Sequence, residues 1–350
     1  MFSEEIKRYQ PHFSALFVAY CSIFPVFLLV LKRTLLNMPL GLIGFYILVG
    51  QIGYLFSVLY IISFHNLWKG RGLHSVFDWL SQWENIITVL SRTLAMLILM
   101  ITMIIFQMNS KYLFNQFLVW NGSWDPILQK IDIIILQQHP WQTINQMIPV
   151  GVLKTIIRFF DLIYVYWFSV QWISIYDAAF FAPEELRVRT FMNFILIWVL
   201  GTIMGGFFAS GGPFFYSVNA YNIQQFNFIQ TMYHEGFLFC AHAQGVLWEN
   251  FLTYEKKVRL GISAFPSLHV AISYFVFLYS RERQKLQYLT FAFFITIWIA
   301  SVVLGWHYFI DGLGAILLVH GSMKISDWIL HVNQWFKQKE NNQSKQVLSK

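Results

Sequence analysis

Long apolar runs restrict the fold of this chain more than any other feature of its sequence. Roughly eight stretches reach the length of about 20 residues that a helix needs to cross the hydrocarbon core of a bilayer. Only helices and closed β-barrels satisfy their own backbone hydrogen bonds in lipid, and these runs lack the alternation of barrel strands. The predicted spans are residues 13–31, 39–64, 86–108, 159–182, 191–210, 264–280, 287–306 and 308–330.

The composition supports the same fold class. Hydrophobic residues make up 57% of the chain and charged residues only 12%, which leaves too little polar surface to cover a water-soluble fold. The net charge of +7 comes from short basic clusters between apolar runs, as the positive-inside rule describes, so we do not expect a nucleic-acid partner. The sequence therefore predicts an all-α, polytopic, integral membrane protein.

The basic clusters also predict an orientation. The short loops around residues 69–71, 187–189 and 281–285, with the basic tail 332–350, fall on one face, which we assign to the cytoplasm. The segments 109–158 and 211–263 are then external, and the amphipathic piece 127–138 is expected to lie at the interface as a helix. We interpret residues 1–31 as an uncleaved anchor.

Four segments follow from this topology. They are N-terminal transmembrane helices (1–108), an external loop with an interfacial helix (109–158), a catalytic transmembrane core (159–331) and a cytoplasmic polar tail (332–350). The absence of long tails favours a bacterial cytoplasmic membrane with the site facing the periplasm. In a eukaryote the site would face the lumen of the Golgi or another endomembrane.

Two short motifs carry the chemistry. The first is Phe265-Pro-Ser-Leu-His269, at the start of the sixth predicted span, and the second is Gly305-Trp-His-Tyr-Phe-Ile-Asp311, between the seventh and eighth. The two histidines are separated by one helix down and one helix back, so both are expected at the same external surface. An isolated interfacial histidine is usually only a polar cap. However, an aspartate in the first turn of an apolar helix is rare and favours function.

The residue types suit phosphoryl transfer. His307 and Asp311 are four residues apart, so on a helix the carboxylate can fix the imidazole tautomer and leave the second nitrogen as a nucleophile. His269, when protonated, can donate a proton to the leaving oxygen. Pro266 is expected to start a helix at Ser267. The N–H groups of Ser267, Leu268 and His269 would then face an anion at a helix N-terminus.

These motifs resemble the type 2 phosphatidic acid phosphatase superfamily. The family patterns Pro-Ser-x-His and His-x-x-x-Asp match Pro266–His269 and His307–Asp311. The resemblance implies a six-helix phosphatase-like core, here with extra N-terminal spans. It also implies a phosphohistidine at His307, orientation by Asp311 and proton donation by His269, without metal or cofactor.

The sequence departs from the family pattern at its basic positions. The arginine of the third family motif is absent before His307, where the chain reads Ser301-Val302, and the first family motif, which contains Lys and Arg-Pro, is also absent. The segment Ala209-Ser-Gly-Gly-Pro-Phe-Phe-Tyr216 instead resembles the Gly-Pro-aromatic segment of the inositol phosphorylceramide synthase branch. The pattern Asp161-Leu-Ile-Tyr164, preceded by Arg158, resembles the same branch. The resemblance covers residues 127–319.

Several residues are candidates for substrate binding. Arg158 is the first candidate for a substitute cation, although a snorkelling interfacial anchor is an alternative interpretation. Tyr216 is a candidate donor to a phosphate oxygen or a member of an aromatic belt. The spacing of His234, Cys240 and His242 fits no tight metal-ligand pattern, and we predict no metal. The predicted substrate-binding set is Ser267, Leu268, Gly212, Pro213, Tyr216 and Arg158.

The sequence thus predicts a membrane enzyme that acts on a lipid phosphoester through a phosphohistidine. Headgroup transfer of the inositol phosphorylceramide synthase type is favoured because a site with fewer cations suits a phosphodiester. Its partners would be a lipid with a phosphate headgroup and a lipid or polyol acceptor. One alternative is a lipid phosphate or polyprenyl pyrophosphate phosphatase. Another, from a different class, is a non-catalytic transporter or lipid-binding protein.

Overall fold

The computed structural model describes residues 123–140, 144, 147–219, 239–252 and 263–348, with scattered positions between 82 and 110. The chain divides into two compact units, residues 1–106 with 255–259, and residues 107–254 with 260–350. The predicted spans 13–31 and 39–64 lie outside the described residues, and 86–108 is described only in part. The fold and the site below belong to the second unit.

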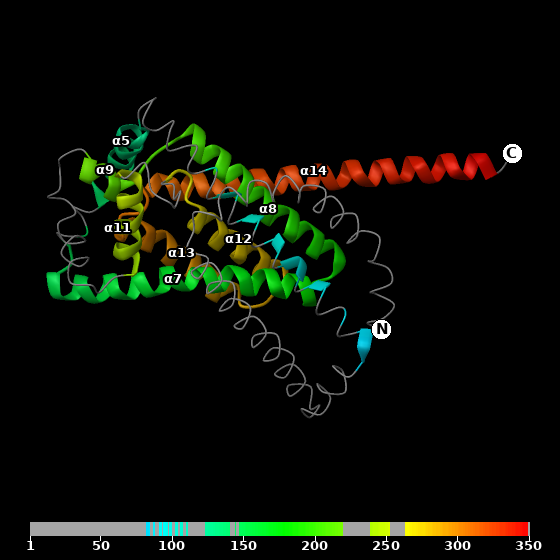
Figure 1. Ribbon diagram of the computed structural model, residues 1–350, viewed down its shortest axis with the longest axis horizontal. Helices are drawn as coiled ribbons and strands as arrows, with labels where there is room; N and C mark the ends of the chain where they lie inside the picture. Colours follow the sequence, from blue (N-terminus) through cyan, green and yellow to red (C-terminus); the bar gives the residue numbers. More distant parts are fainter. Residues whose placement is uncertain are drawn as a thin grey trace. The chain divides into compact units, whose positions relative to one another are not determined.

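The second unit is built from helices joined by turns (Figure 1). Among the residues that the structure describes there is no strand, so the predicted all-α class is confirmed for them. The helices are α5 (Asp125–Leu136), α7 (Val150–Phe181), α8 (Glu184–Phe207), α9 (Pro213–Asn219), α11 (Phe239–Leu252), α12 (Leu268–Glu282), α13 (Gln287–Val303) and α14 (Phe309–Leu348).

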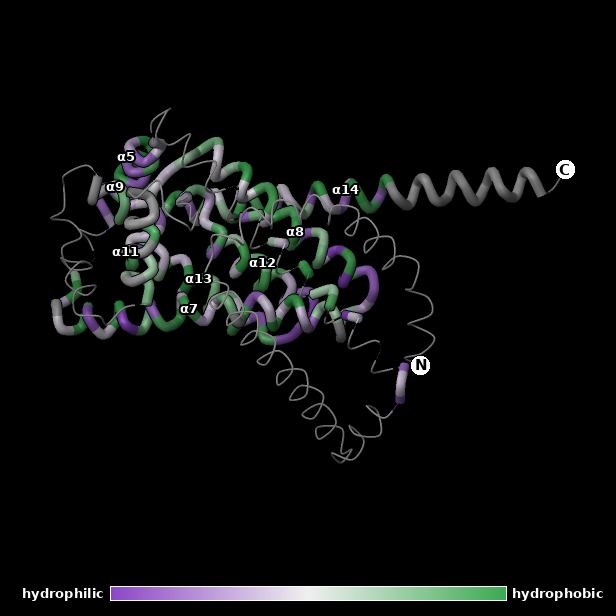
Figure 2. The backbone as a smooth tube through the Cα atoms, viewed as in Figure 1, coloured by the Kyte–Doolittle hydropathy of each residue, from purple (hydrophilic) through white to green (hydrophobic). Residues whose placement is uncertain are grey.

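Three of these helices are long and apolar enough to cross a membrane. They are the stretches Gly151–Ala179 in α7, Glu184–Phe207 in α8 and Phe309–Val332 in α14, and α13 is a shorter apolar helix. Figure 2 shows hydrophobic residues along most of α8, and both hydrophobic and hydrophilic residues in α5. Large apolar side chains also point outward, as lipid-facing residues do. Examples are Phe159, Leu162, Leu289, Ile299, Leu317 and Trp328.

Helix α12 lies at the centre of the bundle and carries the first histidine motif. It packs against α7, α8, α13 and α14. Val270, Ala271 and Ile272 are fully buried, so three successive residues are covered on different sides of the helix. A helix that is hydrophobic on all sides is typical of a bundle interior, and the 15 residues of α12 fit this position.

Two boundaries differ from the sequence prediction. Helix α7 begins at Val150 rather than at residue 159, so the predicted external segment 109–158 ends inside this helix. Hydropathy excluded residues 150–158 because they contain Lys154 and Arg158, but both are good helix formers, and Pro149 directly precedes the first turn. Helix α14 continues to Leu348, so most of the predicted tail is helical.

The connections α7–α8 and α12–α13 meet at the end of the bundle opposite the histidine motifs. Arg189 forms an ion pair with Glu282, and Arg283 Nε lies 3.1 Å from Asp177 Oδ2. Because His269 and Glu282 lie at opposite ends of α12, these ion pairs are one helix length from His269. That this end of the bundle faces the cytoplasm stays a prediction.

Candidate active site

The structure brings the two predicted histidines together. His269 lies in the first turn of α12, and His307 lies in the turn between α13 and α14. The centroids of their imidazole rings are 6.1 Å apart, and the ring planes are inclined by 58°. A phosphoryl group fits between two rings at this separation, because reacting atoms need to approach within about 3–3.5 Å of each other. This separation is compatible with the nucleophile and proton-donor roles predicted for the two histidines.

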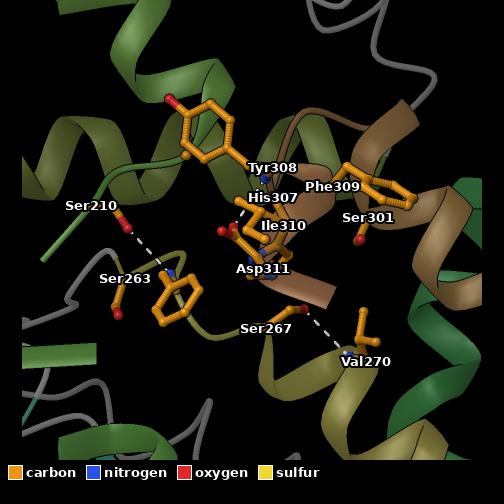
Figure 3. A network of polar contacts seen from close by, with 12 residues as sticks. Ser210, Ser263, Ser267, Val270, Ser301, His307, Tyr308, Phe309, Ile310 and Asp311 are labelled. Atoms are coloured by element: carbon orange, nitrogen blue, oxygen red, sulfur yellow. Dashed lines mark hydrogen bonds and ion pairs between the residues drawn. The ribbon is translucent and has the colours of Figure 1, made fainter. Parts of the chain in front are cut away.

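The carboxylate of Asp311 contacts the imidazole ring of His307. Its Oδ2 lies 3.3 Å from His307 Nδ1 and also accepts a hydrogen bond from Tyr308 N at 2.9 Å. His307 is 5% exposed and Asp311 is fully buried, so solvent does not compete for these contacts. Figure 3 shows the two side chains next to each other. A carboxylate acceptor at Nδ1 places the second nitrogen lone pair on Nε2 of a neutral imidazole.

A backbone hydrogen bond joins the two motifs directly. Ser267 N donates to the carbonyl oxygen of Asp311 at 3.2 Å, and Ser267 Oγ caps α12 by accepting from Val270 N (Figure 3). Helix α12 therefore begins at Leu268, one residue later than predicted, with Ser267 as its N-cap. The Ser267 N–H, predicted to face an anion, donates to Asp311 in this structure. The same role for the N–H groups of Leu268 and His269 stays a prediction.

Two aromatic residues of α7 fix the ring of His269. The Tyr164 ring stacks on it with centroids 4.4 Å apart and planes inclined by 21°. The Trp167 ring lies 4.3 Å away, and its Nε1 donates to the carbonyl oxygen of His269 at 2.9 Å. Aromatic faces attract a cation held over them, which suits an imidazole that carries a proton during a reaction cycle.

The Gly-Pro segment packs against the turn that carries His307. Gly212 has a φ of +84°, and a Cβ at this position would lie 2.2 Å from Trp306 O, so glycine is required for two separate reasons. Phe214 N donates to Gly305 O at 2.9 Å. These contacts hold Gly212 and Pro213 against the turn that contains His307. Direct contact between these two residues and a substrate stays a prediction.

Asp125 of α5 ties the Gly-Pro segment to the second motif. Its carboxylate accepts from Gly211 N at 2.8 Å, from Gly212 N at 2.9 Å and from the Tyr308 hydroxyl at 3.0 Å. Burial raises the pKa of Asp125, although these hydrogen bonds oppose the shift. Because the N–H of Gly212 is bound to Asp125, it does not serve as a donor to substrate.

Asp132, two turns further along α5, caps the helix that carries Asp311. It accepts from Phe309 N at 2.7 Å and Ile310 N at 2.9 Å, the first two N–H groups of α14. Burial raises the pKa of Asp132 to about 6. Sequence analysis missed both aspartates of α5. A helix is present at the place predicted for an interfacial one, with Asp125 and Asp132 buried and Ile127 and Ile134 exposed, and its position at the membrane interface stays a prediction.

Asp161 of α7 caps the N-terminus of α11, as Asp132 caps that of α14. It is 3% exposed and accepts from Phe239 N at 2.9 Å and Cys240 N at 2.7 Å, which begin that helix. The sequence pattern had marked Asp161 only through a resemblance. The structure shows that it joins α11 to α7 one turn before Tyr164.

The remaining predicted residues lie further from these contacts. Tyr216 lies in α9, where its backbone N–H donates to Gly212 O. Arg158 is exposed on α7, and six residues at 100° each place it about 120° around the helix from Tyr164. Leu268 is buried, directed toward Gly201 of α8. Binding roles for Tyr216 and Arg158 stay predictions.

Within the described part of the chain, no three His, Cys, Asp or Glu side chains form a group able to hold a metal ion.

Comparison with known proteins gives one match. A family model described as the PAP2 superfamily, that of the type 2 phosphatidic acid phosphatases, matches residues 150–325, about half of the chain. The match runs from the start of α7 into the first half of α14 and therefore includes both histidine motifs, whereas α5 lies outside it. No curated protein and no solved structure matches this chain.

Proposed function

The chain belongs to the PAP2 superfamily, whose members are phosphatases and phosphotransferases, and we propose that it breaks a lipid phosphoester with His307 as nucleophile and His269 as proton donor. The observation that carries this proposal is the pair of imidazoles 6.1 Å apart, one of them held by a buried carboxylate. An imidazole of this kind is an activated nucleophile, and the second imidazole is within reach of the leaving group.

The reaction has two steps. In the first, Nε2 of His307 forms a bond to phosphorus, the bond from phosphorus to the lipid alcohol oxygen breaks, and His269 gives its proton to that oxygen. In the second, an incoming hydroxyl loses its proton to His269 and attacks phosphorus, which breaks the N–P bond. Asp311 stabilises the positive charge that His307 carries in between. Water as the acceptor gives hydrolysis, and an alcohol gives transfer.

We propose transfer of a headgroup, as in inositol phosphorylceramide synthases, rather than hydrolysis. No arginine stands before His307 where the family motif has one, and Ser301 Oγ donates to Trp298 O within its own helix. A phosphodiester carries about one negative charge and a phosphomonoester about two, so the diester needs fewer cations. The Gly-Pro-aromatic segment beside His307 adds support, because it resembles that branch.

The test uses the full chain in detergent with phosphatidylinositol labelled at phosphorus. We expect an acid-labile, base-stable label on His307, and its transfer to added ceramide. His307→Ala should abolish labelling and lower turnover by at least about 10³-fold. His320→Ala is the matched control, since His320 is an exposed histidine of α14 bonded to Tyr274. Turnover that survives His307→Ala would remove the proposed nucleophile, and loss of turnover with a chelator would favour a metal.

The role of His269 has its own test. His269→Ala should slow the release of a lipid alcohol by about 10²–10⁴-fold, because a poor leaving group needs a proton. The loss should be much smaller on a p-nitrophenyl phosphoester, whose leaving group departs without one. An equal loss on both substrates would assign His269 to positioning instead.

A folded protein that binds lipid but yields neither product nor phosphohistidine would favour the transporter or lipid-binding alternative.

A further inference from the structure

Several buried polar atoms around the histidines have no hydrogen-bond partner among the residues that the structure describes, and two of them belong to residues of α7 and α11. They are the hydroxyl oxygen of Tyr164, a residue 4% exposed, and Oε1 of Gln244, a residue 0% exposed. Almost all buried polar atoms in proteins are paired, because an unpaired one loses its bonds to water without compensation. Two such atoms beside one candidate active site indicate a missing ligand.

Direct contacts link Tyr164 to His269 and Gln244 to the turn before His307. The Tyr164 ring stacks on His269 at 4.4 Å and lies parallel to the Trp306 ring at 6.5 Å, with 10° between the planes. Gln244 Nε2 donates to Leu304 O at 2.9 Å, in the turn that leads to His307. Tyr164 thus borders the proposed proton donor, and Gln244 borders the turn of the proposed nucleophile.

The helices that carry the two side chains are also fixed to each other. Asp161 of α7 binds the first two N–H groups of α11, and Cys240 and Gln244 follow one turn apart on the buried side of that helix. Tyr164 lies one turn after Asp161 on the buried side of α7. The faces with Tyr164 and Gln244 therefore meet around the Trp306 turn.

The chemistry of these atoms restricts the ligand. Because Leu304 O requires a donor, the amide of Gln244 can only be oriented with Nε2 toward it, which leaves Oε1 as a pure acceptor. A deprotonated phosphate oxygen has no proton to give and would be repelled by Oε1. A hydroxyl group can donate to Gln244 and accept from Tyr164. We infer that Tyr164 and Gln244 bind a hydroxyl-bearing, uncharged part of the substrate, the polyol of a headgroup or the hydroxyl of an acceptor.

This inference rests on the proposed function and names the substrate class of that same site. It does not depend on Arg158 or on any other cation. The phosphate and the polyol would be bound by different groups, the phosphate between the two imidazoles and the polyol between α7 and α11. A bare phosphomonoester would then fill only the first of these places.

The test measures binding rather than turnover. The full chain carrying His307→Ala, which cannot consume a probe, is titrated in detergent with myo-inositol 1-phosphate and with methyl phosphate, and tryptophan fluorescence is recorded. The two probes share the phosphate and differ in hydroxyl groups. We expect the inositol probe to bind at least about tenfold more tightly. Tyr164→Phe keeps the stacked ring and should reduce this preference about 3- to 10-fold, as should Gln244→Met.

Tyr166→Phe is the matched control, since Tyr166 is 55% exposed on the same helix and should leave the preference unchanged. Equal affinity for both probes, or no binding of either, would overturn the inference. So would a preference that survives both substitutions in folded protein, because buried water would then be the partner of these atoms. Absence of turnover in the wild-type chain would refute the proposed function while this binding preference stayed measurable.

Discussion

The substitution Gly212→Ala is expected to displace the turn that contains His307, although Gly212 lies outside the two histidine motifs. The new Cβ would lie 2.2 Å from Trp306 O, whereas real contacts of this kind are essentially never shorter than 3.0 Å. The two segments must therefore separate by about 1 Å. The φ of +84° adds about 1–2 kcal/mol for an L-residue, and overpacking against backbone adds about 1–3 kcal/mol.

The expected loss of stability is thus about 2–5 kcal/mol. The expected loss of turnover is about 10²-fold, because a displacement of about 1 Å in a catalytic group has effects of that size. Turnover is measured with labelled phosphatidylinositol, and stability by thermal unfolding in the same detergent.

Two glycines of the same unit provide matched controls. A Cβ at Gly151 or at Gly321 would have no neighbour within 4 Å, and both residues lie in helices without a positive φ. Alanine at either position should keep full turnover and stabilise the helix by up to about 1 kcal/mol. If Gly212→Ala kept turnover within twofold and an unchanged unfolding midpoint, the proposed packing of the Gly-Pro segment on the His307 turn would be refuted.

Three further predictions concern the buried aspartates and the start of α14. Burial raises the pKa of Asp132 from 3.8 to about 6, so the folded chain binds this proton more tightly than the unfolded chain. Its stabilising contribution is complete below about pH 4 and falls by at most about 3 kcal/mol as the pH rises through 6. Asp132→Asn should remove that part of the pH dependence of the unfolding midpoint; equal slopes in both proteins would contradict the assignment. Asp161→Ala leaves two N–H groups of α11 unpaired and should cost about 1–3 kcal/mol, with faster maleimide labelling of buried Cys240 in a Cys21→Ser background. Gly312→Ala would place a Cβ 2.0 Å from Trp298 Nε1 and should destabilise the fold by about 1–3 kcal/mol, seen as altered tryptophan fluorescence.

The sequence predicted those parts of the site that depend on short spacing in the chain. His307 and Asp311 are four residues apart and their side chains meet as predicted, although His307 lies in the turn before α14 and not on the helix itself. The start of α12 was predicted one residue too early, at Ser267, which is instead the N-cap of the helix. Span ends were less accurate, as α7 shows, because hydropathy locates the apolar middle of a helix and not its charged first turns.

The α5 aspartates illustrate what sequence spacing does not reveal. Asp125 and the Tyr308 hydroxyl that it binds are 183 positions apart, and a polar helix face has the same pattern whether it meets water or buried backbone N–H groups. The same holds for Tyr164 and Gln244, whose proximity to the histidines depends on how α7 and α11 pack. The sequence by itself indicated an apolar, helical chain suited to a membrane and the two histidine motifs, because apolar length and residue spacing are local properties. Only the tertiary structure decided which buried polar groups face each other, because that depends on contacts between helices distant in the chain.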